Sequence, residues 1–218
     1  MGYAWVAFRL TISVSWVQNY NMIIMPSNNT GRVVRDLFKK YPDKTGQLFS
    51  PEGWRPPQHQ YALDNGAFIK FNEKKYFKML DASKQYSKPL WVVAPDVVGC
   101  HDRTIALWNY YLPRLKEYEY KLAFVAQDGC NPEDVPDCFC IFVGGYDPWK
   151  MDNFHRFQGI REWTHVGRVN SVGRLETCER VGINSIDGTG WMHARDSKFY
   201  GLMEYFNGKQ QMEIFDGV

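Results

Sequence analysis

The sequence predicts a small (β/α)8 barrel of the TIM type, formed as a single α/β domain over residues 1–218. Short, continuously apolar runs alternate with amphipathic stretches, and nearly every apolar run ends in a residue able to do chemistry. Continuous rather than alternating apolar runs are typical of a parallel sheet covered by helices. A doubly wound open sheet is the alternative, but no GxGxxG or GxxxxGK[ST] motif follows an apolar run, which disfavours its nucleotide-binding forms.

The expected elements follow from the periodicity of apolar residues along the chain. Seven apolar runs are expected to be strands: residues 22–25, 61–63, 90–94, 122–126, 139–143, 163–166 and 183–186, with 212–215 as the eighth candidate. Amphipathic spacing predicts helices over residues 32–41, 74–86, 102–118, 171–181 and 196–206. Residues 47–57 contain three prolines and are expected to form a loop.

Composition and charge exclude several classes of protein. The 26 basic and 24 acidic residues nearly balance, so nucleic-acid binding is neither required nor excluded. No apolar run approaches the ~20 residues of a membrane span. Residues 1–20 are apolar, but Arg9 interrupts them and no basic segment precedes them, so we expect an ordered N-terminal extension. The odd count of five cysteines, without a CxxC pair, predicts free thiols in a reducing, cytoplasmic compartment.

Polar or small residues follow the predicted strands at once. In a parallel barrel these strand ends converge on one face, where barrel enzymes build their sites. Asp, Asn and Gly also follow strands as turn formers and helix caps, which is the structural alternative for each of them. The residues concerned are Asp64, Asn65, Asp96, Gln127, Gly144, Gly145, Arg168 and Asp187.

These motifs, taken in order, resemble those of a known enzyme family. The series DNGAF (64–68), PD (95–96), AQDG (126–129), VGG (143–145), HVGR (165–168) and IDGTG (186–190) resembles the tRNA-guanine transglycosylase superfamily. It is most similar to the short branch of 7-deazaguanine DNA transglycosylases from phages and bacterial islands. The resemblance spans residues 22–195 and implies a barrel that exchanges a base in DNA, in a bacterial or phage-infected cell.

The resemblance also implies a role for each matching residue. Asp187 matches the nucleophilic aspartate and Asp64 the aspartate that handles the proton of the leaving and incoming purine. Asp96 and Gln127 match residues that bind the guanine edge. The turn of Gly144 and Gly145 matches the backbone that hydrogen-bonds to the base.

The residue types suit this chemistry independently of the resemblance. An N-glycosidic bond breaks through an oxocarbenium-like state that a carboxylate below C1′ stabilises. A covalent glycosyl–aspartate then lets one base leave before another arrives. A base in a duplex must first be flipped out, and Phe68 is the aromatic residue expected to stack on it, with packing between barrel and helix as the alternative.

The sequence departs from the tRNA-acting enzymes at several positions. Asn65 and Ala67 replace Ser and Gly of the first motif, and Ile69 stands where those enzymes have Gln. Gly-Thr-Gly-Trp follows Asp187 in place of Cys-Val-Leu-Pro, and no cysteine follows it to form their zinc site. We therefore expect DNA rather than tRNA as the partner, with no metal and no cofactor.

Further candidate residues follow from their chemistry alone. His101 opens a predicted helix and is expected to orient a phosphate or assist proton transfer, unless it serves only the helix start. Arg168 and Arg195 lie on the expected active face and suit phosphate contact, since a guanidinium pairs bidentately with phosphate, with a surface salt bridge as the alternative for Arg195. His165 precedes a strand end and is expected to be a satisfied inner histidine. A metal site at Cys130, Cys138 and Cys140 is disfavoured by their spacing.

Three functions remain open from the sequence. The first is a DNA base-exchange transglycosylase that replaces guanine with a 7-deazaguanine base such as preQ0. The second is a DNA glycosylase of the same fold, in which water resolves the intermediate and a modified base is excised in phage defence. The third is a catalytically idle barrel that binds nucleic acid or a protein. An accessory protein or a second copy of the chain is a further expected partner.

Overall fold

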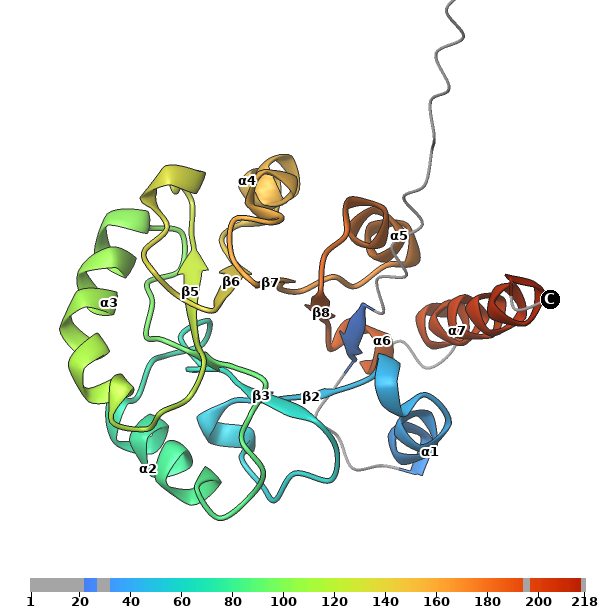
Figure 1. Ribbon diagram of the computed structural model, residues 1–218, viewed down its shortest axis with the longest axis horizontal. Helices are drawn as coiled ribbons and strands as arrows, with labels where there is room; N and C mark the ends of the chain where they lie inside the picture. The colour runs from blue at the N-terminus through green and yellow to red at the C-terminus, as the bar shows by residue number, and fades with distance from the viewer. Residues whose placement is uncertain (1–21, 27–31, 194–196, 217–218) are drawn as a thin grey trace, which may run out of the picture.

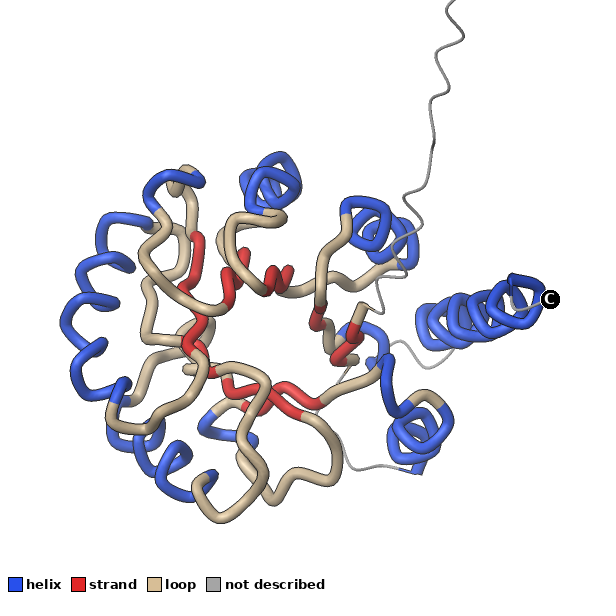
Figure 2. The backbone as a smooth tube through the Cα atoms, in the orientation of Figure 1, coloured by secondary structure: helices blue, strands red, loops and turns tan. Residues whose placement is uncertain are grey.

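A computed structural model describes residues 22–26, 32–193 and 197–216. The expectations for residues 1–20 and for Arg195 lie outside these ranges. Eight parallel strands form one sheet in the order β1-β8-β7-β6-β5-β4-β3-β2. A parallel bridge between Ile24 and Thr45 joins the two ends of this order, so the sheet closes on itself. The strands form a ring with the helices outside it, which confirms the predicted (β/α)8 barrel (Figures 1 and 2).

The strands are short and the helices between them vary in length. The strands are β1 (Ile23–Met25), β2 (Gln47–Phe49), β3 (Tyr61–Leu63), β4 (Val92–Val93), β5 (Leu122–Ala126), β6 (Cys140–Val143), β7 (Trp163–Val166) and β8 (Ser185–Asp187). The helices are α1 (Arg32–Lys40), α2 (Glu73–Ser83), α3 (His101–Lys116), α4 (Asp147–Asn153), α5 (Val172–Val181), α6 (Gly190–His193) and α7 (Ser197–Asp216).

Two expectations about the strands are wrong. Residues 212–215 belong to helix α7, and the remaining strand is β2, inside the segment expected to be a loop. Strand β2 has only three residues, too few to show a period, and its pairing in register with β3 (Gln47 opposite Tyr61) defines it. Helices α4 and α6 were also not expected. Both are short, and Pro148 near the start of α4 suits a first turn although it suggests a loop in the sequence.

The core has two layers, as alternation along the strands requires. One set of side chains fills the barrel interior: Ile23, Met25, Ala62, Trp91, Val93, Ala123, Val125 and Cys140. The alternate set faces the helices and forms the larger cluster, with Ile24, Leu63, Phe124, Ile141 and Ile186 among its buried members. By the same alternation, His165, Ser185 and Asp187 lie on the inner side of β7 and β8, and this carries polar groups into the barrel mouth.

Local signals in the sequence fix the helix ends that position the site. Asn72 caps α2 by accepting a hydrogen bond from Lys75 N at 3.0 Å, and Tyr76 on this helix donates to the carbonyl of Val93 at 2.7 Å. Gly182 ends α5 with φ of 86°, in the left-handed region that glycine adopts without strain. No helix of the described residues is long and apolar enough to cross a membrane.

Candidate active site

A cavity of about 740 Å³ opens at the carboxyl ends of the strands. It is lined by the predicted site residues Asp64, Asn65, Phe68, Asp96, Gln127, Gly144, Gly145, Arg168 and Asp187. Strands β3, β6, β7 and β8, or the turns that follow them, bring most of these residues together from distant parts of the sequence. The volume suits a small ligand such as a nucleoside.

Asp187 ends strand β8 and is held from two sides. Its Oδ2 lies 3.0 Å from His165 Nε2, and its Oδ1 accepts the backbone N–H of Arg168 at 3.2 Å. Gly167 lies beside it, and a Cβ there would come within 2.7 Å of the Phe142 ring. The carboxyl is therefore oriented in the cavity by a side chain and by backbone, and the neighbouring turn needs glycine.

His165 is fully buried and lies in a chain of polar contacts that ends at Asp187. Trp163 Nε1 donates to Ser185 Oγ at 2.7 Å, and Ser185 Oγ lies 2.8 Å from His165 Nδ1. Since a carboxylate only accepts, His165 Nε2 donates to Asp187 Oδ2. His165 thus donates to Asp187, and this contact was missed from the sequence, where it was expected only to be satisfied in the interior.

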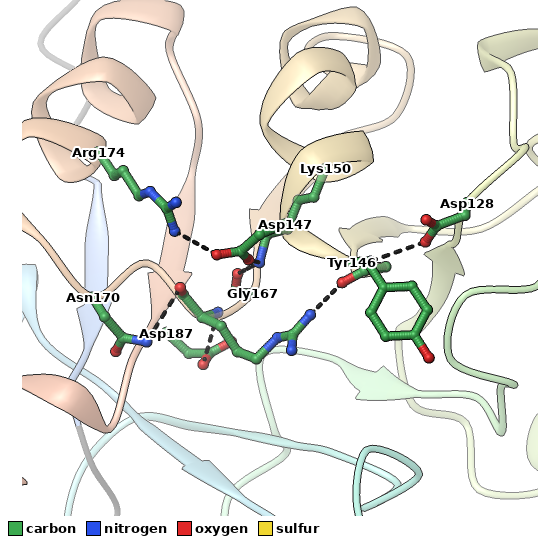
Figure 3. A network of polar contacts seen from close by, with 10 residues as sticks. Asp128, Tyr146, Asp147, Lys150, Gly167, Asn170, Arg174 and Asp187 are labelled. Atoms are coloured by element: carbon green, nitrogen blue, oxygen red, sulfur yellow. Dashed lines mark hydrogen bonds and ion pairs between the residues drawn. The ribbon is translucent and has the colours of Figure 1, made fainter.

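A buried lysine braces the turn next to Asp187 (Figure 3). Lys150 of α4 is fully buried; its Nζ donates to Gly167 O at 2.8 Å and lies 2.9 Å from Asp147 Oδ1. Burial lowers the pKa of Lys150, whereas its bond to Asp147 raises it. Arg174 also pairs with Asp147 at 2.8 Å, and these two cations hold the pKa of Asp147 at about 2.

Arg168 spans the mouth of the cavity. Its backbone has φ of 59°, in the left-handed region that is costly for a residue with a side chain. Its guanidinium donates to the carbonyl of Gly145 and lies 4.4 Å from the centre of the Phe68 ring. The contact of Arg168 with phosphate stays a prediction; the structure places Arg168 in the lining of the cavity.

Asp64 follows β3 and faces the other acidic groups of the cavity. Burial raises its pKa to about 7, and the charges of Asp96 and Asp187 add to this rise, against backbone hydrogen bonds from Gly66 and Asn65 that lower it. Near neutral pH the carboxyl therefore exchanges a proton readily.

Asp96 is the centre of an amide cluster at the inner end of the cavity. Asn65 Nδ2 donates to its Oδ1 at 2.6 Å, and Gln127 Nε2 donates to its Oδ2. Burial raises the pKa of Asp96 to about 6, although both amide donors lower it. Gln127 Oε1 in turn accepts the N–H of Gly99 at 2.8 Å. Asp96 and Gln127 are therefore pre-oriented, with lone pairs of Asp96 left over for the donors of a ligand.

Asn65 acts as a structural link that the sequence did not reveal. Besides Asp96, its Nδ2 donates to the carbonyl of Ala94 at 2.7 Å, and its Oδ1 accepts the N–H of Ala67 at 2.7 Å. The residue was expected to contact substrate. In the structure its amide already has three partners, so it ties the turn after β3 to Asp96.

The glycine turn after β6 allows a ligand to approach the backbone. A Cβ on Gly144 would come within 2.8 Å of Val125 Cγ1 and 3.0 Å of Gln127 Nε2. Gly145 has φ of +77°. Both positions require glycine for steric or conformational reasons, and both line the cavity.

Two further candidates are resolved by their position. Phe68 is 61% exposed and lines the cavity, so it does not pack between barrel and helix. His101 does not line the cavity. It is the first residue of α3, and its ring packs edge-on against Phe124, which belongs to the layer between strands and helices. The expected role of His101 in substrate binding therefore has no support from its position.

The cysteines are free thiols, as expected. Cys138 precedes β6 and Cys140 begins it, while Cys130 lies in a loop; burial raises the pKa of the Cys130 thiol to about 12. Within residues 22–26, 32–193 and 197–216, no three His, Cys, Asp or Glu side chains form a group that could hold a metal ion.

Comparison with known proteins identifies no family for this chain. No family model matches the chain, and no curated protein is similar to it. Among solved structures, the chain is similar to one from the tryptophan synthase complex of Pyrococcus furiosus, with 12% identity, a TM-score of 0.48, and coverage of 83% of this chain and 93% of that one. Strand order and register define the chain as a (β/α)8 barrel, and a cavity that holds three aspartates opens at the carboxyl ends of its strands.

Proposed function

We propose that this barrel cleaves an N-glycosidic bond and exchanges the base through a covalent glycosyl–aspartate. The observation that carries the proposal is the pairing of two different carboxyls in one cavity. Asp187 is fixed as an acceptor by His165 and the Arg168 N–H, whereas the pKa of Asp64 is raised to about 7. One oriented nucleophile and one exchangeable proton are what a double displacement at C1′ requires.

The first step uses both carboxyls. An oxygen of Asp187 forms a bond to C1′ as the C1′–N bond breaks, and the electron pair of that bond leaves with the base. Protonated Asp64 donates its proton to the departing base, which prevents a charged leaving group. Because the Nε2–H of His165 donates to Oδ2 of Asp187, the carboxyl presents a fixed face to the sugar.

The second step reverses the first with a different base. Asp64, now a carboxylate, removes the N–H proton of the incoming base, whose nitrogen attacks C1′ and releases Asp187. The arrangement therefore needs no other nucleophile. If water takes the place of the incoming base, the same residues excise a base and leave an abasic site.

Residues of the cavity other than Asp64 and Asp187 support recognition of a purine. A guanine-type edge presents an N1–H and an amino group, and the free lone pairs of Asp96 accept such donors. Gly144 and Gly145 also line the cavity, and the Arg168 guanidinium already donates to the carbonyl of Gly145, so a ligand would replace this contact. Phe68, exposed at the mouth, offers an aromatic face once the Arg168 side chain moves off it.

The substrate assignment rests on the motif resemblance. The series of strand-end motifs is similar to that of 7-deazaguanine DNA transglycosylases, and Gly-Thr-Gly-Trp follows Asp187 in place of the Cys-Val-Leu-Pro of the tRNA-acting enzymes. We therefore propose DNA as the acceptor and a 7-deazaguanine base as the incoming group, in a bacterial or phage-infected cell.

A single-turnover incubation with labelled DNA tests this function. Duplex and single-stranded DNA are each incubated with and without preQ0, and released base, abasic sites and incorporated base are measured by mass spectrometry. Incorporation without abasic sites supports exchange. Abasic sites without incorporation indicate a glycosylase, and identical results for wild type and Asp187→Ala reject the role of Asp187.

A further inference from the structure

The turn that follows β3 carries an apolar tip beside the cavity. Among the residues that the structure describes, five large hydrophobic side chains are exposed: Phe68, Ile69, Tyr110, Tyr146 and Tyr200. Two of them, Phe68 and Ile69, are consecutive and both line the cavity. Ile69 is 88% exposed, the largest value of the set. Single exposed apolar residues are ordinary on a surface, but an apolar pair at the mouth of a site marks an interaction surface.

The tip is held in place by the residues that organise the site. Asn65 Oδ1 accepts the N–H of Ala67, and Gly66 O accepts the N–H groups of both Ile69 and Lys70 at 3.2 Å. Gly66 has φ of +76°, and a Cβ there would lie 3.2 Å from Pro51 Cδ. The turn is therefore closed by its own backbone and tied through Asn65 to Asp96. A tip fixed in this way presents Ile69 at a set position relative to the cavity.

Cations surround the tip on its C-terminal side. Lys70 follows Ile69 directly and lines the cavity, and Lys74 and Lys75 lie in the first turn of α2; all three are exposed. Lys75 pairs with Glu52 at 2.8 Å, whereas Lys70 and Lys74 form no ion pair within the described part of the chain. An exposed aliphatic side chain next to exposed lysines suits duplex DNA. The lysines match its phosphates, and the aliphatic side chain matches the apolar stack of bases between them.

We propose that Ile69 is a wedge that enters the base stack of duplex DNA and fills the space left by the extruded base. The inference rests on the proposed function and deepens it, because it names double-stranded DNA as the substrate form. A base inside a duplex cannot reach Asp187, so it must leave the stack, and unstacking is costly unless another group takes its place. Phe68 then faces the extruded base inside the cavity, and Ile69, the next residue, contacts the bases that remain.

The test compares Ile69→Ala with Tyr110→Ala on matched substrates. Tyr110 is 73% exposed on the outer helix α3, away from the cavity lining, so its variant loses a comparable exposed side chain without touching the site. Each protein is assayed in single turnover on one DNA sequence as a duplex, as a duplex with a mismatch at the target, and as a single strand. Ile69→Ala is expected to lower the ratio of duplex to single-strand rate by about tenfold or more, with part of the loss restored by the mismatch.

A second measurement tests base extrusion by Ile69 independently of bond cleavage. In the Asp187→Asn background, 2-aminopurine beside the target base reports extrusion by its fluorescence without bond cleavage. An extrusion signal that depends on Ile69 but not on Tyr110 supports the wedge even if no DNA is processed, in which case the proposed function alone fails. Equal loss on duplex and single strand, or no extrusion signal on any duplex, overturns the wedge. Binding of the protein to phospholipid vesicles instead of DNA, lost in Ile69→Ala, would also overturn the wedge.

Discussion

Replacing Asp64 by asparagine is expected to abolish activity while it increases the stability of the folded protein at pH 8. In the folded state burial and the nearby Asp96 and Asp187 raise its pKa from 3.8 to about 7. The folded protein thus binds a proton that the unfolded chain has released over this range of pH. Stability then falls as pH rises from about 4 to about 7, because the ionised carboxyl is unfavourable in the cavity.

The size of this effect follows from the shift in pKa. A shift of about three pH units at about 1.4 kcal/mol per unit gives roughly 4 kcal/mol as an upper limit. Asp64 retains some exposure to solvent in the cavity, which screens part of it, so about 1–2 kcal/mol is expected. The asparagine side chain keeps an oxygen for the backbone N–H groups of Asn65 and Gly66 while removing the charge. In a domain of this length, such a gain raises Tm by roughly 2–8 °C.

Thermal unfolding followed by circular dichroism at pH 4.5 and pH 8 measures the difference. Asp64→Asn should be more stable than wild type at pH 8, close to wild type at pH 4.5, and inactive at both. Asp152→Asn, an exposed carboxyl on α4, is the matched control and should change neither stability nor activity. A variant that is less stable at pH 8, or equally stabilised at both pH values, would refute the reasoning.

Three further substitutions test the parts of the site. His165→Ala removes the donor to the nucleophile and should lower kcat by about 100-fold with little change in KM; His165→Gln, which keeps an N–H donor, should restore part of it, and equal loss in both would argue for a purely structural role. Gly144→Ala places a methyl 2.8 Å from a valine side chain and should raise KM in steady-state assays, whereas Gly173→Ala, with open space around it, should leave KM unchanged. Lys150→Met leaves the carbonyl of Gly167 unpaired and should lower the free energy of unfolding by about 1–3 kcal/mol in urea titrations; an unchanged unfolding midpoint would show that the brace is dispensable.

The barrel was predictable because the buried strands of a parallel sheet consist of consecutive apolar residues. Residues 61–63 and 122–126 were located to the residue, and the polar residues that follow such runs converge in one cavity. Strand β2 was not predictable. It has three residues, begins with Gln47 and lies before three prolines, so only its pairing with β3 makes it a strand. Residues 212–215, Met-Glu-Ile-Phe, belong to helix α7, and so short a run does not distinguish a helix from a strand.

The sequence pointed to the acidic residues of the cavity, but not to the residues that hold these carboxyls and the neighbouring turns in place. Asp64, Asp96 and Asp187 each stand at a strand end, which is visible in the sequence. Lys150 lies on α4, far along the chain from its acceptor at Gly167, and nothing in the local pattern indicates that it is buried. The contact of His165 with Asp187 had a usable signal. Ser185 and Asp187 are two apart on β8 and so share a face, and His165 lies opposite Ser185 on the neighbouring strand.

Covalent capture of the nucleophile tests the central claim most directly. The protein is mixed with a DNA strand carrying a 2′-fluoro-modified target nucleotide, which slows breakdown of a glycosyl–enzyme, and is digested for peptide mass spectrometry. We expect a DNA adduct on the peptide that contains Asp187, lost in Asp187→Asn and retained in Asp152→Asn. Base release by wild type and Asp187→Asn at the same rate, with no adduct in either, would contradict a covalent role for this carboxyl.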